Sequence, residues 1–139
     1  MGRALSLAIG ILSLGGTASA DEPHHRFDGI WTTILSCSNA RGALGYSFEF
    51  PSTVKDDLLH AEKGTKGEPG WLQIDGHILA DGAANLYANG LVGAAPYAVG
   101  DRPAGSVYGY HIDAQFSVNA GSGHRVEGRP CTVTFTRKN

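Results

Sequence analysis

Two cysteines, Cys37 and Cys131, constrain the fold of this 139-residue chain more than any other feature of its sequence. Each lies in a segment where apolar and polar residues alternate, and alternation with a period of two is typical of a β-strand with one buried face. The pattern is clearest in the second segment, where Cys131, Val133 and Phe135 share one face and three threonines share the other. A bridge between the two cysteines would join the first strand of the domain to its last.

The first twenty residues indicate that the cysteines reach an oxidising compartment. A short basic start with Arg3 precedes an apolar stretch, and small residues at 17–20 lead to Asp21, which is the three-part layout of a secretory signal peptide. An apolar stretch of about thirteen residues is shorter than the roughly twenty needed to span a bilayer. We therefore expect a signal peptide over residues 1–20 and a periplasmic or secreted domain over 21–139, with no membrane span and a Cys37–Cys131 disulfide.

The rest of the chain is rich in glycine and in short alternating segments, with no convincing helix. Asp81-Gly82 favours a tight hairpin turn, because glycine accepts the positive φ that such turns need. Short connections favour an antiparallel up-and-down order, and closure into a barrel hides the edge strands. We expect one all-β domain, an antiparallel up-and-down β-barrel, with a β-sandwich as the alternative. About eight strands are expected, at residues 28–37, 45–50, 52–56, 58–63, 71–80, 83–90, 106–118 and 130–138, with 91–105 as the longest loop.

The disulfide also predicts how the barrel closes. The first and last strands of an eight-stranded meander become antiparallel neighbours on closure. If Cys37 faces Cys131, then Trp31 faces Arg137, and the alternation puts Trp31 on the interior face. We expect the Arg137 guanidinium within about 6 Å of the Trp31 ring, where a cation and an indole attract each other.

Gly29 and Trp31 near the start of the first strand, with Arg137 near the chain end, resemble the signature of the lipocalin–avidin superfamily. In those barrels the tryptophan closes one end and an arginine of the last strand covers its ring. The resemblance implies the same barrel-end closure by Gly29, Trp31 and Arg137. The chain lacks the further motifs of an avidin or a typical lipocalin, so neither biotin nor retinoid binding is implied.

The chain beyond the leader also resembles a group of uncharacterised small exported alphaproteobacterial proteins. The shared stretches are 27–29, 72–82 with its two Asp-Gly pairs, and 129–131. This resemblance implies export and a β-barrel fold and suggests no activity.

Aromatic side chains at interior-facing positions are candidates to line a ligand cavity. An eight-stranded barrel is either filled by side chains or wide enough for one small ligand, and the pattern leaves both open. Buried tyrosine hydroxyls need partners, which favours a polar interior. The candidate ligand-lining residues are Tyr46, Phe48, Tyr108, Tyr110 and Phe116.

The charge of the chain limits its partners. The net charge is −2, and loss of Arg3 with the leader lowers it further. Nucleic-acid affinity rests on clustered cations, so we expect no nucleic-acid partner. The loops at 38–44 and 119–130 should meet at the disulfide end and form one positive cluster, suited to an acidic protein, a carboxylate or a phosphate. Its members are Arg41, His124, Arg125 and Arg129.

The remaining motifs predict neither a metal site nor catalysis. His24-His25 comes too late after the expected cleavage for an amino-terminal metal site, which wants histidine third. His111 and Asp113 share the outward face of one strand, and two ligands do not define a zinc site. No serine lies in a nucleophile elbow, and both cysteines are committed to the bridge. We therefore expect no enzyme, no cofactor and no metal.

These patterns predict a binding module, for a small molecule in the barrel mouth. The main alternative is a protein-interaction or hydrolase-inhibitor module that acts through its loops. Metal binding in the periplasm, or an unrecognised enzyme, ranks third.

Overall fold

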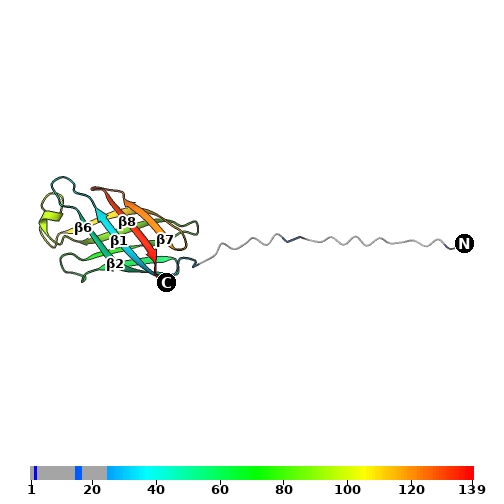
Figure 1. The fold of residues 1–139 in the computed structure, drawn as a ribbon. Helices are drawn as coiled ribbons and strands as arrows, with labels where there is room; N and C mark the ends of the chain where they lie inside the picture. The colour runs from blue at the N-terminus through cyan, green and yellow to red at the C-terminus, as the bar shows by residue number, and fades with distance from the viewer. Residues whose placement is uncertain (1, 3–14, 17–24) are drawn as a thin grey trace.

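The chain folds into a closed barrel of eight antiparallel strands in sequence order (Figure 1), which confirms the predicted up-and-down architecture. The computed structural model describes residues 2, 15–16 and 25–139, so the predicted cleavage site and His24 lie outside the described residues. No helix in the described part of the chain has the length and apolar character needed to cross a membrane. The strands are β1 (Gly29–Cys37), β2 (Tyr46–Lys55), β3 (Leu58–Lys63), β4 (Leu72–His77), β5 (Ala83–Leu91), β6 (Val107–Phe116), β7 (Ala120–Arg125) and β8 (Cys131–Arg137), and one 3₁₀ turn, η1 (Ala95–Tyr97), lies between β5 and β6.

The first departure from the predicted strands is at Pro51. The segments expected as two strands, 45–50 and 52–56, form the single strand β2, which continues through this proline. Pro51 pairs with Thr32 of β1, whereas pairing with β3 begins only at Ser52. Pro51 therefore lies on a local edge of the sheet, the kind of position at which a strand tolerates a residue without an N–H.

The second departure is β7, which lies inside the segment expected as the loop 119–130. Its interior-facing positions are Gly121 and Gly123, so it lacks the buried apolar residues by which the other strands are recognised. A Cβ at Gly121 would lie 2.7 Å from the Phe116 ring, and one at Gly123 would lie 2.6 Å from the Asp113 carbonyl oxygen. Bulky neighbours on β6 thus require glycine here, and only residues 126–130 form the connection at the disulfide end.

The seam between β1 and β8 has the register that the disulfide predicts. Cys37 pairs with Cys131 at one end, where the disulfide forms, and Trp31 pairs with Arg137 at the other. Trp31 is fully buried and donates its indole N–H to the Phe27 carbonyl at 2.9 Å. The interior at the Trp31 end is therefore filled by side chains.

Arg137 closes this filled end. Its guanidinium lies 4.9 Å from the centre of the Trp31 ring, within the expected distance. It donates hydrogen bonds to the carbonyl oxygens of Val118 (2.7 Å), Asp28 (2.7 Å) and Arg26 (2.6 Å). One side chain of β8 thus holds the turn between β6 and β7 against the segment that precedes β1.

Candidate binding site in the barrel mouth

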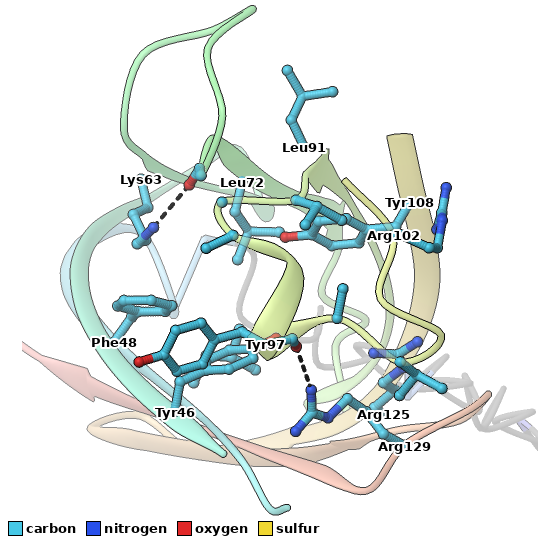
Figure 2. Close-up of a pocket in the computed structure, with 17 residues that line it drawn as sticks. Tyr46, Phe48, Lys63, Leu72, Leu91, Tyr97, Arg102, Tyr108, Arg125 and Arg129 are labelled. Atoms are coloured by element: carbon cyan, nitrogen blue, oxygen red, sulfur yellow. Dashed lines mark hydrogen bonds between the residues drawn. The ribbon is translucent and has the colours of Figure 1, made fainter. Parts of the chain in front are cut away.

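The barrel is open at the disulfide end, where a cavity of about 340 Å³ lies in its mouth (Figure 2). Leu35 of β1 and Leu72 of β4 contribute to the lining, and both are buried. The rest of the lining consists of aromatic side chains, cationic side chains and small residues, among them Gly93, Ala94 and Ala98. The two ends of the barrel therefore differ, since one is packed and the other is hollow.

The segment predicted as the long loop 91–105 forms one wall of the cavity. Backbone hydrogen bonds close its base, where the Val92 N–H donates to the Ser106 carbonyl at 2.9 Å. Its tip is fastened to the connection between β1 and β2, because the Leu44 N–H donates to the Pro96 carbonyl at 2.9 Å. The segment is thus a tethered wall of the mouth, with η1 at its tip.

Of the five aromatic residues predicted to line a cavity, only some lie in its wall. Tyr46, Phe48 and Tyr108 line the mouth. Tyr110 lies outside the lining, so its expected lining role is wrong; it is buried, and its ring is stacked on that of Tyr108 at 6.2 Å. Phe116 belongs to the filled end, so its expected role as a lining residue is wrong, because an interior-facing position does not tell how far along the barrel axis a residue lies.

Tyr97 is a lining residue that the sequence did not reveal. It lies in η1 and its ring meets that of Tyr46 edge-on at 6.4 Å. The Tyr46 ring in turn lies 5.1 Å from that of Phe48. The glycine, alanine and proline around Tyr97 carry no strand periodicity, so only the unusual length of the loop pointed to this segment.

Burial perturbs the tyrosines of the mouth. It raises the pKa of Tyr108 to about 12, with a further increase from the neighbouring Tyr46. Burial also raises the pKa of Tyr46 and of Tyr110, and the nearby Arg125 guanidinium opposes the increase in both. The Tyr110 hydroxyl is buried and has no hydrogen-bond partner among the described residues. The phenols therefore stay neutral at physiological pH, and those of Tyr46 and Tyr108 add uncharged polar atoms to the lining.

Arg129 is the most buried cation of the site, with 6% of its surface exposed. Its Nη1 donates to the Tyr97 carbonyl at 2.8 Å, and its Nη2 donates to the carbonyls of Leu44 at 3.0 Å and Ser38 at 2.5 Å. Its guanidinium lies 5.2 Å from the centre of the Tyr46 ring. Its buried Nε has no hydrogen-bond partner among the described residues.

Arg125 reaches the mouth from the last residue of β7. Its Nε donates to the Glu127 carbonyl at 2.5 Å, and its guanidinium lies 4.0 Å from the centre of the Tyr110 ring. Its two Nη atoms have no hydrogen-bond acceptor among the described residues. A rigid ring thus supports the guanidinium, while two nitrogens keep donor capacity.

Lys63 and Arg102 complete the positive lining. Lys63 ends β3, which is four strands away from β7 in a ring of eight, so it lies across the mouth from Arg125 (Figure 2). Its Nζ donates to the Gly70 carbonyl at 2.8 Å and lies 3.9 Å from the centre of the Phe48 ring. Burial lowers the pKa of Lys63. Arg102, in the wall segment, donates to the backbone carbonyl of Val107.

Among the residues that the structure describes, no carboxylate lines this cavity. In the described part of the chain every ion pair involves a histidine, so none of the four cations has a carboxylate oxygen within 4.0 Å. Clefts lined by charge of one sign concentrate ligands of the opposite sign. The net charge of the chain is negative, yet the mouth of the barrel carries positive charge that no carboxylate of the described residues neutralises.

Of the four residues of the predicted positive cluster, two line the cavity and two do not. Arg125 and Arg129 both line the mouth, but His124 is exposed on the outer face of β7. Arg41 is exposed in the turn after β1, at a φ of 46°, and lies outside the cavity lining. Because 120–125 is a strand and not a loop, the consecutive residues His124 and Arg125 point to opposite faces.

His111 and Asp113, the outward pair considered for metal binding, have separate partners. The Nδ1 of His111 lies 2.5 Å from a Glu127 carboxylate oxygen, and the other oxygen accepts the His111 backbone N–H at 2.7 Å. These hydrogen bonds lower the pKa of Glu127. Asp113 accepts a hydrogen bond from the Asn85 amide at 2.7 Å. The two side chains do not converge on a shared site.

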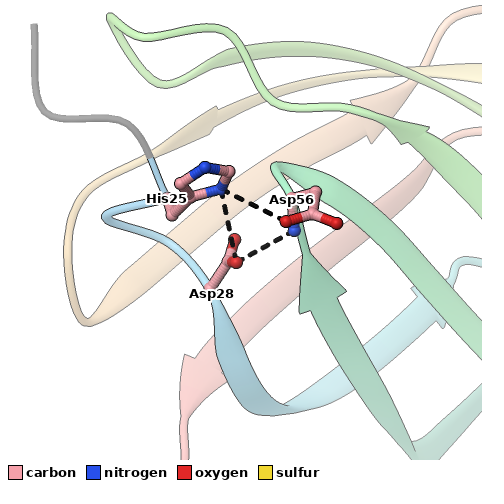
Figure 3. A group of neighbouring side chains, drawn as sticks. All are labelled: His25, Asp28 and Asp56. Atoms are coloured by element: carbon pink, nitrogen blue, oxygen red, sulfur yellow. Dashed lines mark hydrogen bonds and ion pairs between the residues drawn. The ribbon is translucent and has the colours of Figure 1, made fainter.

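A second group of possible metal ligands lies at the filled end of the barrel (Figure 3). His25, Asp28 and Asp56 place one ligand atom each within 4.8 Å of one another. The Asp28 carboxylate accepts the backbone N–H of Asp56 at 2.9 Å and of Asp57 at 3.1 Å. Both of these turn residues have positive φ, so the turn between β2 and β3 by itself explains the position of Asp28.

Comparisons of the sequence with protein-family models, with curated proteins and with solved structures each gave no match. We therefore infer the function from the geometry and charge of the mouth.

Proposed function

We propose that this protein is an exported binding module that holds a small molecule with an apolar or aromatic body in the barrel mouth. The cavity of about 340 Å³ at one end of an otherwise filled barrel carries this proposal. Small-molecule sites are concave, mostly apolar and largely formed in advance, with volumes of roughly 300–1,000 Å³. The mouth combines such a volume with several aromatic rings and a few polar atoms.

The rigidity of the mouth also supports ligand binding. The disulfide joins β1 to β8 at its rim, and three hydrogen bonds from Arg129 tie the wall segment to the connection after β1. A site that is ordered before the ligand arrives pays less entropy on binding. Export is proposed from the signal-peptide layout of residues 1–20, and the disulfide fits it because such bonds persist in oxidising compartments.

Titration with the neutral fluorescent probe N-phenyl-1-naphthylamine tests the cavity. We expect saturable binding by the wild-type protein and binding at least about tenfold weaker in Ala98→Trp, because an added indole fills the space that the ring of the probe needs. Ala104→Trp is the matched control, since Ala104 is exposed on the same segment and does not line the cavity. Equal affinity in wild type and Ala98→Trp would contradict the proposal.

Native mass spectrometry of the protein purified from its own periplasm tests the same proposal without a surrogate. We expect a mature chain that begins at Asp21 and carries additional mass of a small molecule. A stoichiometric protein in place of a small molecule would favour the protein-interaction or hydrolase-inhibitor alternative. The exposed side chains of Leu44 and Tyr97 beside the mouth are the apolar contacts that such a partner would use.

A further inference from the structure

If the proposed function holds, the positive charge of the mouth indicates which class of small molecule the cavity binds. In the described part of the chain, four cations and no carboxylate line this cavity, although acidic residues outnumber basic ones in the full sequence. Solvated lysines and arginines on a surface need no explanation. Cations that share one partly enclosed space repel one another, and burial already lowers the pKa of Lys63. An arrangement of this kind is stabilised by an anion that enters the cavity.

Arg129 gives the strongest single reason to expect that anion. A buried charge is costly unless it is paired, and the guanidinium of Arg129, a buried residue, donates only to neutral carbonyl oxygens. Its Nε lacks any hydrogen-bond partner among the described residues. The carbonyls fix the position of the guanidinium without neutralising it.

Arg125 supplies the accessible donors. Its Nη atoms have no acceptor in the described part of the chain, while its guanidinium lies over the Tyr110 ring, 4.0 Å from the ring centre, and this contact holds it in place. A planar guanidinium with free N–H groups matches the oxygens of a carboxylate or a phosphate, and such charge-assisted hydrogen bonds are about twice as strong as neutral ones.

The aromatic side chains occupy the space beside the cations. Tyr46 and Phe48 line the cavity as a tilted pair, and Tyr97 meets Tyr46 from the wall segment (Figure 2). An apolar or aromatic group that lies against these rings would place a charged substituent near the cations, which end strands or lie in the loops around them. The mouth thus offers one surface to each half of an amphiphilic molecule.

We propose that the ligand is an organic anion, with an aromatic or alicyclic body in the mouth and an acidic group bound by Arg125 together with Arg129. Arg102 and Lys63 add long-range attraction. A carboxylate and a phosphate share the required chemistry, which is a compact group of anionic oxygens.

A pair of probes that differ only in charge tests this proposal. The anionic probe is 1-anilinonaphthalene-8-sulfonate, and the neutral one is N-phenyl-1-naphthylamine, which has the same two ring systems without the sulfonate. We expect the anionic probe to bind the wild-type protein at least about tenfold more tightly, through charge-assisted hydrogen bonds. The preference should weaken in high salt, which screens charge.

Variants of Arg125 assign the preference to the site. Arg125→Gln should bring the two affinities within about threefold, chiefly by weakening the binding of the anionic probe, and Arg125→Lys should restore part of the preference. Arg41→Gln removes the same charge outside the cavity and should keep the wild-type preference. Near-ultraviolet circular dichroism checks the fold of each variant. If Arg125→Gln is not folded, Arg102→Gln serves in its place, with a smaller loss expected.

Competition against the anionic probe separates the acidic groups. Naphthalene-2-carboxylate and 2-naphthyl phosphate should displace it more effectively than the neutral naphthalene-2-carboxamide, and the better of the two anions identifies the acidic group. Equal binding of both probes to the wild-type protein, or an undiminished preference in folded Arg125→Gln, would overturn the anion proposal and leave the binding function standing. Absence of binding by both probes would overturn the binding function itself.

Discussion

Reduction of the Cys37–Cys131 disulfide is expected to lower the free energy of unfolding by about 4.5 kcal/mol. The two cysteines are separated by 94 positions, so six of the eight strands, β2 to β7, lie within the loop that they close. Cross-linking a loop of this length removes much of the conformational entropy of the unfolded chain. A domain of this size has a total stability of roughly 5–15 kcal/mol, so the bridge supplies a large share of it.

The reduced protein should nevertheless keep its barrel in the absence of denaturant. β1 and β8 remain paired from Trp31↔Arg137 to Cys37↔Cys131. The hydrogen bonds of Arg137 at the filled end do not depend on the disulfide. The expected effect is therefore a lower unfolding midpoint and not a loss of the fold.

Urea unfolding followed by tryptophan fluorescence, with and without a thiol reductant, measures the effect. With an m-value of about 2 kcal/mol/M, the midpoint should fall by about 2 M urea. The double variant Cys37→Ala, Cys131→Ala serves as the control, and reductant should not move its midpoint. A shift below about 0.5 M in the wild-type protein would refute the reasoning, because the bridge would then constrain the unfolded chain by no more than about 1 kcal/mol.

Three further predictions concern the core and the barrel ends. Arg137→Met should destabilise the protein by about 2–4 kcal/mol in denaturant unfolding, because three carbonyls lose charge-assisted donors. Arg137→Lys should destabilise it by less. Equal stability of the wild-type protein and both variants would contradict the role of Arg137 in closing the barrel. Gly121→Val should cost about 1–3 kcal/mol in thermal unfolding through overpacking against Phe116, whereas the outward-facing Ser122→Val should cost less than about 0.5 kcal/mol. Burial raises the pKa of Tyr108 to about 12, so the folded chain retains a proton that the unfolded chain loses near pH 10, and stability should fall as the pH rises from about 10 to about 12. Ultraviolet absorbance should show the phenolate of this tyrosine only as the barrel unfolds, and its appearance in the folded barrel near pH 10 would count against its burial.

The barrel and its seam follow from local patterns in the sequence. The alternation around each cysteine identifies the interior face, and one disulfide is then enough to predict the whole β1–β8 register, including Trp31 opposite Arg137. The predicted number of strands, eight, is correct only because two errors cancel. Splitting β2 at Pro51 adds one strand, and taking β7 for a loop removes one.

Both errors come from properties of neighbouring strands. A proline predicts a break unless the neighbouring strand on its far side does not pair with it, as is the case here, where the pairing of β2 with β3 begins only at Ser52. Glycines at 121 and 123 predict a loop unless Phe116 and the β6 backbone occupy the space where their side chains would be. Neither condition can be read from the segment itself.

The candidate site was predictable only in part. Tyr46, Phe48, Tyr108, Arg125 and Arg129 are all candidates from the sequence, and all line the mouth. The sequence could not exclude Phe116, which lies at the other end, or Arg41 and His124, which lie outside the cavity. It also could not identify Lys63, Tyr97 and Arg102, which come from a strand end and a loop.

The sequence by itself determined the strand-rich fold, the interior face of the end strands and the seam where the barrel closes. These properties depend on alternation with a period of two and on one covalent link, which are local or nearly so. Only the tertiary structure decided which end of the barrel is filled and which is hollow. That difference depends on how far each interior side chain lies along the barrel axis and on where the connections fold, so Trp31 and Phe27 fill one end while the segment after β5 forms a wall beside the open one.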